Sequence, residues 1–107
     1  MASHSTCEVV AGMFRYTLLV HFVYILRCGD GTLYTGYARD PRNREKVHNS
    51  GRGARYTAGR RPVSLVYSEA LGSHGDALRR ERQLKRWPRA KKEALIHACD
   101  GQDRPRS

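Results

Sequence analysis

The sequence is poor in acidic residues, in cysteine and in long apolar runs. Among its 107 residues, 10 Asp and Glu stand against 20 Lys and Arg, which gives a formal net charge of +10. A surplus of that size favours a polyanionic partner, because basic side chains that neutralise phosphates release condensed counterions. We therefore expect a nucleic acid as the partner. The basic residues are spread over several segments and form no single amphipathic stretch, which disfavours a membrane surface.

The three cysteines, Cys7, Cys28 and Cys99, are too few and too widely spaced for a disulfide framework. Sparse, unpaired cysteine is typical of a reducing compartment, so we expect a cytoplasmic protein. His97 and Cys99 resemble half of a zinc site, but no second half with ligand spacing accompanies them. A structural zinc ion is therefore not expected.

The most apolar run covers residues 17–26 and contains His21. It is too short to cross a bilayer as a helix, which needs about 20 apolar residues. A secretion signal would need a cleavage site with small residues after this run, and the segment that follows, 27–31, is instead typical of a turn. We expect neither a membrane span nor a secretion signal.

A chain of 107 residues has room for one ordinary domain. Residues 1–20 lack a clear hydrophobic period, and we expect them to be a loosely ordered leader. The folded domain is expected over residues 21–98. Residues 99–107 are predicted to be a charged, disordered tail.

A β-hairpin is predicted near the start of the folded domain. The β-branched and aromatic segments 21–28 and 32–37 flank a Gly-Asp-Gly turn. If that turn pairs Cys28 with Thr32, then Tyr24 and Tyr34 fall on one face of the sheet, because side chains alternate with period two.

Three helices are predicted further along the chain. Asp40 can cap the first, over 41–49, where a proline is tolerated in the first turn. Asp76 can cap the second, which ends near residue 86, and the third runs over 87–98.

A third strand is predicted over residues 63–67, after a basic loop that glycines break open. The expected fold class is α/β (α+β), with a small three-stranded antiparallel sheet flanked by helices in the order β-β-α-β-α-α.

Glu81 is the residue whose position most needs an explanation. Ala77, Glu81 and Leu84 fall at i, i+4 and i+7, so the carboxylate lies on the helix stripe expected to face inward. Burying a charge is costly unless it is paired or binds a metal ion. The residues alone leave two interpretations open, a metal ligand or a salt bridge to Lys85 or Arg44, and slightly favour the salt bridge.

Arg44 and His48 are four residues apart and share one face of the first helix. Arginine offers a planar fork to phosphate oxygens, and histidine can shuttle protons near neutral pH. Taken alone, this pair is more typical of a solvated basic helix. Tyr24 and Tyr34, taken alone, are typical of core aromatics.

Together these residues resemble the GIY-YIG nucleases. Val23-Tyr24 is followed by Tyr34-Thr35-Gly36, with the second tyrosine ten positions after the first, similar to the paired motif that names the family. Arg44 lies eight residues beyond Gly36, where the family has its arginine, and His48 follows four residues later. Glu81 lies on a downstream helix, as in the family. Further similarity to small standalone bacterial members covers 24–28, 48–51, 53–57, 65–69 and 77–81.

The resemblance extends over residues 21–98, with local departures. Phe22 stands where the first motif has glycine, and Thr35 where the second has isoleucine or valine. Asn43 and Glu45 flank the arginine where the family pattern has a basic and an apolar residue.

The resemblance implies hydrolysis of phosphodiester bonds with a single divalent ion, Mg²⁺ or Mn²⁺, held by Glu81. It implies that Tyr24 is the general base on the attacking water and that His48 accepts or relays its proton. Tyr34 would position water or phosphate, and Arg44 would stabilise charge that develops on the phosphate. A free tyrosine has a pKa of about 10, so Tyr24 would need nearby positive charge.

Tyr56 is expected to add a further hydroxyl at the substrate edge of the catalytic site. No separate sequence-reading module is visible, so we expect a DNA endonuclease of weak sequence specificity, serving DNA repair or recombination and directed by a partner or by DNA structure. The alternative is a non-catalytic nucleic-acid-binding module with the same fold. Contacts with nucleic acid are expected from Arg39, Arg52, Arg55, Arg60, Arg61, Arg79, Arg80 and Lys85.

Overall fold

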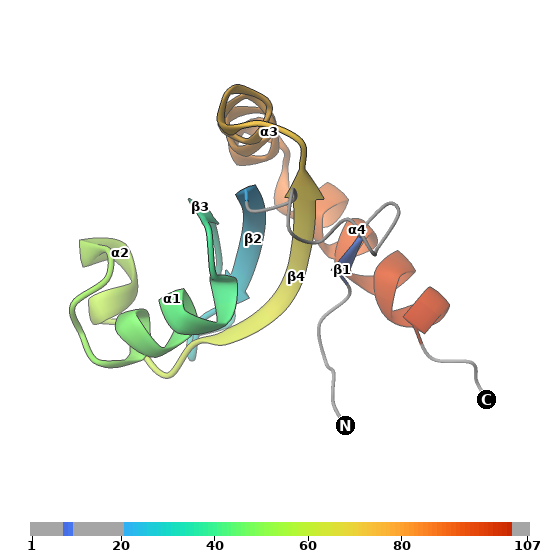
Figure 1. The fold of residues 1–107 in the computed structure, drawn as a ribbon. Helices are drawn as coiled ribbons and strands as arrows, with labels where there is room; N and C mark the ends of the chain where they lie inside the picture. Colours follow the sequence, from blue (N-terminus) through green and yellow to red (C-terminus); the bar gives the residue numbers. More distant parts are fainter. Residues whose placement is uncertain (1–7, 10–20, 104–107) are drawn as a thin grey trace.

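The computed structural model describes residues 8–9 and 21–103 of the chain. Its centre is a four-stranded sheet with the strand order β1-β4-β2-β3 (Figure 1). The elements are β1 (Glu8–Val9), β2 (His21–Arg27), β3 (Leu33–Ala38), α1 (Pro41–Asn49), α2 (Arg55–Ala58), β4 (Ser64–Leu71), α3 (His74–Arg86) and α4 (Arg89–Asp103). No helix in the described part of the chain is long and apolar enough to cross a membrane.

The predicted hairpin is confirmed, together with its register. β2 and β3 are antiparallel, with Tyr24 opposite Gly36 and Leu26 opposite Tyr34. The amide of Cys28 donates to the carbonyl of Thr32 at 2.8 Å, which closes the turn as expected. Tyr24 and Tyr34 therefore lie on the same face of the sheet.

The antiparallel core of the predicted sheet is confirmed, because β4 pairs antiparallel with β2 on the side away from β3. The two-residue strand β1 adds to this core by pairing parallel with β4. It comes from the segment expected to be a loose leader, and the rest of that segment lies outside the described residues. β4 is longer than predicted, because it continues to Leu71.

The first helix begins and ends as expected. The Asp40 carboxylate accepts a hydrogen bond from the amide of Asn43 at 3.1 Å, and Pro41 opens the helix. Glu45, which departs from the family pattern, has a structural use: its carboxylate accepts a hydrogen bond from the amide of Leu65 at 2.7 Å. This contact attaches α1 to β4.

The other helices differ from expectation at their ends. The predicted cap of α3 at Asp76 is wrong, because Ser73 caps the helix by accepting from the amide of Asp76 at 3.0 Å. The basic loop contains a one-turn helix, α2, whose four residues are too few to show a helical period. The last helix was expected to end at residue 98 and instead continues to Asp103.

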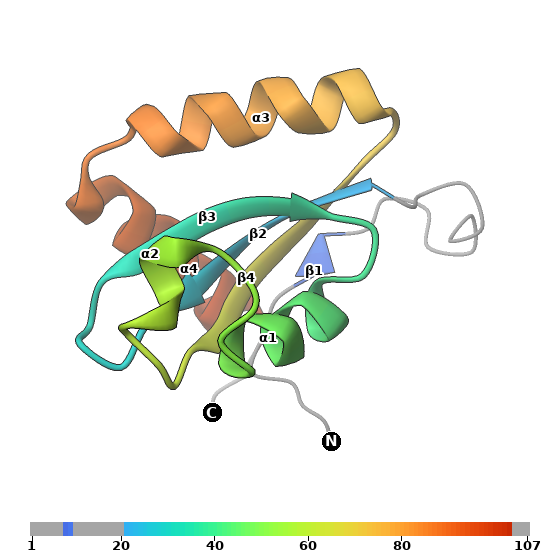
Figure 2. The same cartoon turned by 90° about the vertical axis from the view of Figure 1, so that its left-hand side faces the viewer.

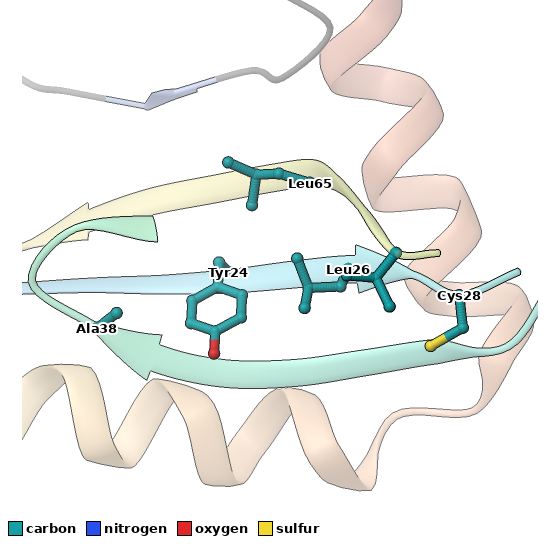
Figure 3. Packing of buried hydrophobic residues seen from close by; sticks show 6 residues of the cluster. Tyr24, Leu26, Cys28, Ala38 and Leu65 are labelled. Atoms are coloured by element: carbon teal, nitrogen blue, oxygen red, sulfur yellow. The ribbon is translucent and has the colours of Figure 1, made fainter. Parts of the chain in front are cut away.

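The two faces of the sheet carry different parts of the core. One face holds a cluster that includes Tyr24, Leu26 and Leu65 (Figure 3), and α1 and α2 lie on that side in Figure 1. On the other face, Val23 packs with Ala77 and Leu84 of α3, and Ile25 with Ile96 of α4. α3 runs alongside β3 (Figure 2), which brings this helix to the edge of the hairpin.

Candidate active site

Tyr24 lies across the backbone of the neighbouring strand. A Cβ built on Gly36 would come within 2.5 Å of the Tyr24 hydroxyl, so any larger residue would displace the ring. The side chain is only 1% exposed, and its hydroxyl points toward β3 in Figure 3. The glycine of the second motif is therefore needed because it lets the phenol extend over β3.

His48 is completely buried beneath this hydroxyl. Its Nε2 lies 3.1 Å from the Tyr24 hydroxyl oxygen, and its Nδ1 lies 2.7 Å from Oγ1 of Thr57 on α2. A Cβ on Gly53 would overlap the imidazole, so the loop before α2 can pass the ring only as glycine. Helix α1 supplies the histidine, and the segment 53–57 encloses it.

The hydrogen bonds of Thr57 indicate which nitrogen of His48 carries the proton. The Thr57 hydroxyl donates to the carbonyl of Ala54 at 3.0 Å, which uses its single proton. Its oxygen lone pairs are then available to Nδ1–H of His48 at 2.7 Å. The competing contact, from the Ala54 amide to Nδ1, is longer at 3.3 Å. The shorter pair favours protonated Nδ1, which leaves Nε2 free to accept the proton of Tyr24.

Burial changes the acidity of both partners in opposite directions. It raises the pKa of Tyr24 above its ordinary 10.0, and although Arg44 opposes the shift, Tyr34 and Glu81 add to it. Burial lowers the pKa of His48 below its ordinary 6.5, and the charge of Arg44 lowers it further. At neutral pH both side chains are therefore uncharged. The positive charge expected beside Tyr24 is present in Arg44, but burial outweighs it.

A row of rings leads from the buried pair to the surface. The ring centroid of Tyr34 lies 5.1 Å from that of His48 and 5.9 Å from that of Tyr56. Tyr56 is 39% exposed, and the guanidinium of Arg60 lies 4.0 Å from its ring centroid. Tyr56 thus forms the exposed end of this row of rings.

Glu81 stands at the edge of the core rather than within it. Ala77 and Leu84 on the same stripe are fully buried, whereas the Glu81 side chain is 19% exposed. Its Oε2 lies 3.2 Å from Nζ of Lys85, so the salt bridge considered from the sequence is present. Because Glu81 also raises the pKa of Tyr24, its charge lies near the phenol. The charges of Arg44 and Glu81 thus both act on Tyr24.

The only acidic side chain assigned to the site, Glu81, limits how the site could bind a metal ion. The described residues contain no group of three or more His, Cys, Asp or Glu side chains that could hold an ion by themselves. Glu81 is a single carboxylate that reaches solvent. This donor set fits Mg²⁺ or Mn²⁺ held by one carboxylate, waters and substrate phosphate, an arrangement that Mg²⁺ commonly adopts. Lys85 would have to release the carboxylate.

The basic residues expected to contact nucleic acid divide into two groups. The side chains of Arg39, Arg52 and Arg55 are exposed and make no hydrogen bond or ion pair within the described ranges. The others have partners inside the protein. Arg60 pairs with Asp30 at 3.1 Å, Arg61 donates to the carbonyls of Ala58 and Asn49, Arg79 pairs with Asp76, Arg80 pairs with Glu69 and Lys85 pairs with Glu81.

Thr57 and Gly53 are functional candidates that the residues alone did not single out. The sequence places Thr57 nine residues from His48, and no helical or strand period links them. The contact depends on α2 folding back onto α1. Only the family resemblance over 53–57 gave a sign of their importance.

The chain is similar in sequence to known proteins. Residues 20–94 match the family model described as the GIY-YIG catalytic domain. A UPF0213 protein from Staphylococcus aureus is 54% identical over 76 residues, which is 71% of this chain and 93% of that protein. The solution NMR structure of a protein from E. faecalis is 39% identical, with a TM-score of 0.51, covering 73% of this chain and 83% of that one. A UPF0213 protein structure from Bacillus halodurans is 49% identical over the same shares, with a TM-score of 0.48.

Proposed function

Because the chain belongs to the family of GIY-YIG catalytic domains, we propose that it is a metal-dependent endonuclease that hydrolyses phosphodiester bonds in DNA. The observation that carries this proposal is the buried contact of 3.1 Å between the Tyr24 hydroxyl and Nε2 of His48. A phenol held against an unprotonated imidazole nitrogen, with an arginine and a carboxylate beside it, is suited to moving a proton next to a phosphate.

In this mechanism Tyr24 and His48 act as one proton relay. The raised pKa of Tyr24 keeps the phenol protonated, so it cannot serve as a free phenolate base. Instead, Tyr24 takes the proton of the attacking water as it passes its own to Nε2 of His48. The lowered pKa of His48 keeps that nitrogen available at neutral pH. Thr57 holds the imidazole with Nδ1 protonated.

Arg44 and Glu81 deal with the charge of the phosphate. Arg44 is half-buried and its charge acts on both Tyr24 and His48, which supports a role in stabilising charge on the phosphate oxygens. Glu81 would hold Mg²⁺ or Mn²⁺, which supplies Lewis-acid stabilisation of that charge. Tyr34 would position the water or the phosphate between the relay and Tyr56.

The residues that the structure describes contain no separate module for reading bases, so the proposed activity has weak sequence specificity, in a cytoplasmic protein of DNA repair or recombination. Arg39, Arg52 and Arg55 are exposed and are suited to contacts with phosphate, which position a substrate without reading its sequence.

The test is a nicking assay on single-stranded, duplex and branched DNA with Mg²⁺, Mn²⁺ or EDTA. We expect cleavage only with a divalent ion, and a loss of at least about 100-fold in Glu81→Gln and in Arg44→Ala. Lys46→Ala removes an exposed cation from the same helix as Arg44 and is the matched control, with cleavage close to wild type.

The alternative function, a non-catalytic nucleic-acid-binding module, predicts binding without cleavage. The ion pair between Glu81 and Lys85 is the observation in its favour, because it satisfies the carboxylate without a metal ion. Cleavage that persists in both variants, or wild-type protein that binds DNA but never nicks it with either ion, would reject the endonuclease.

A further inference from the structure

Helix α3 presents different chemistry on opposite faces. Arg79, Gln83 and Arg86 fall at i, i+4 and i+7 and form one stripe along the helix. Glu81 is two residues beyond Arg79, which is a rotation of about 200° around the helix axis. The carboxylate therefore faces the candidate active site while this stripe faces away from it.

The stripe forms part of a groove of about 700 Å³. Four arginines of α3 line the groove, and Asp76 is its acidic side chain. Trp87, at the end of the helix, and Leu71, at the end of β4, supply apolar surface. The lining arginines are Arg79, Arg80, Arg82 and Arg86.

Two of these arginines keep their full binding capacity. Arg79 pairs with Asp76, and Arg80 donates to Glu69 and Gln83, so their charges are partly neutralised inside the protein. Arg82 and Arg86 are exposed and make no hydrogen bond or ion pair with any part of the chain that the structure describes. Like charges gathered in this way repel one another unless an anion joins them.

Two cations, Arg80 of α3 and Lys91 of α4, lie near the ring of Trp87. The ammonium of Lys91 lies 4.3 Å from the centroid of the Trp87 ring, and the guanidinium of Arg80 lies 5.3 Å from it. Two cations thus lie close to the indole at one end of the groove.

We propose that this groove binds the sugar–phosphate backbone of a second segment of nucleic acid, apart from the strand in the candidate active site. Guanidinium groups bind phosphate oxygens through paired hydrogen bonds, and Arg82 and Arg86 have such donors free. The apolar surface of Trp87 and Leu71 suits the sugar. A nucleic acid is favoured over an acidic protein because the net charge of +10 and the family both point to it.

The two surfaces cannot share a phosphate. α3 stands between them, and a helix with its side chains is about 10 Å across. A substrate that fills both must pass over the helix or contribute two segments. The inference takes its ligand class from the proposed function, but binding in the groove does not require cleavage.

The chain offers a site-specific probe, since Trp87 is its only tryptophan. The full-length protein is titrated in EDTA with a 20-nucleotide single strand and with the matching duplex, while Trp87 emission and the anisotropy of labelled DNA are both recorded. We expect Trp87 emission to change and to saturate together with the anisotropy.

The variant Arg82→Gln/Arg86→Gln removes the two free guanidinium groups. We expect this variant to bind DNA at least about tenfold more weakly and to lose the change in Trp87 emission. The salt dependence of its binding constant should be weaker, by an amount that corresponds to about two phosphate contacts. The matched control Arg42→Gln/Lys46→Gln removes the same charge from α1 and should keep the emission change. Thermal melts of both variants confirm that they fold.

Three results would overturn the inference: binding by anisotropy with unchanged Trp87 emission, equal effects of the two double variants, or an emission change produced by poly-glutamate but not by DNA. Glu81→Gln separates the two proposals, because it should abolish cleavage and keep the emission change. A wild-type protein that shows the emission change but never cleaves would reject the nuclease and leave the groove in place.

Discussion

The hydroxyl oxygen of Tyr24 and Nε2 of His48 lie 3.1 Å apart in the interior, although 24 residues separate them in the chain. The tyrosine comes from the first strand of the hairpin and the histidine from the end of α1. Both are uncharged at neutral pH, because burial raises the pKa of one and lowers that of the other. The proposed proton relay rests on this contact.

Removal of the Tyr24 hydroxyl should stop the relay and leave the fold intact. In Tyr24→Phe the ring can still lie over Gly36, so we expect cleavage to fall about 100-fold or more while the melting temperature changes by a few degrees. The control is Tyr67→Phe, which removes a hydroxyl that donates to Glu69 at 2.8 Å outside the site. That variant should lose about 1 kcal/mol of stability and keep its activity. Equal activity in the two variants would contradict the relay.

The pH dependence of cleavage should follow His48 rather than Tyr24. The rate should rise with pH through the lowered pKa of His48, below 6.5, and then stay level to about pH 9, because the pKa of Tyr24 is raised above 10.0. A rate that keeps rising tenfold per pH unit between 7 and 9 would indicate a free phenolate base instead. The measurement is single-turnover cleavage, with His97→Gln as an exposed control.

His48 should also affect stability with pH. Its folded pKa lies below the unfolded value of 6.5, so the unfolded chain binds more protons between the two. The stabilisation is complete above pH 6.5 and is lost as the pH falls through the folded pKa. Urea unfolding from pH 5 to 8 should show this loss, and His48→Gln should lack it.

Thr57 should act by positioning His48. Thr57→Val keeps the shape but removes the acceptor for Nδ1–H, which favours the tautomer stabilised by the Ala54 amide. Nε2 would then carry the proton and could not accept another, so we expect the rate to fall at least about tenfold. Thr57→Ser restores the hydroxyl and should recover most of the activity. If Thr57→Val and Thr57→Ser have the same cleavage rate, Thr57 contributes only to packing.

Two glycine substitutions test whether Gly53 is needed to leave room for the imidazole of His48. Gly53→Ala places a Cβ against the His48 ring, so we expect the free energy of unfolding to fall by about 1–3 kcal/mol. The variant should also lose most of its cleavage activity. Gly59→Ala is the matched control, since a Cβ there meets nothing within 4 Å. It should be neutral or slightly stabilising. Similar melting temperatures for the two variants would count against the tight enclosure of His48.

A salt bridge far from the site should control stability in acid. Arg27 holds both oxygens of Glu93 at 2.8 Å, and this hydrogen bonding lowers the pKa of Glu93 from 4.5 to about 2. The stabilisation is complete above pH 4.5 and is lost as the pH falls toward 2. Glu93→Gln should lower the free energy of unfolding at pH 7 by about 1.5–3 kcal/mol, measured by urea unfolding. Its stability should also depend less on pH below 4.5 than that of the wild type. Asp76→Asn, in an exposed pair, should change little.

The local parts of this structure could be read from the sequence. The Asp-Gly turn and the alternation of side chains determined the hairpin and its register, and Asp40 with Pro41 determined the start of α1. These features depend on residues close together in the chain. The elements that the sequence did not indicate, α2 and β1, have four and two residues, too few for a hydrophobic period. They form because they pack on or pair with distant segments.

Some features of the site are likewise indicated by the sequence, and others arise only from the fold. The spacing of Tyr24, Tyr34, Arg44, His48 and Glu81 in the sequence is sufficient to indicate the family. Only the tertiary structure decided that His48 is buried against Tyr24, that Thr57 orients it, and that α3 turns Glu81 toward the site and an arginine groove away from it. Proximity and burial set acidity and charge pairing, and both arise from contacts between segments that the linear sequence keeps apart.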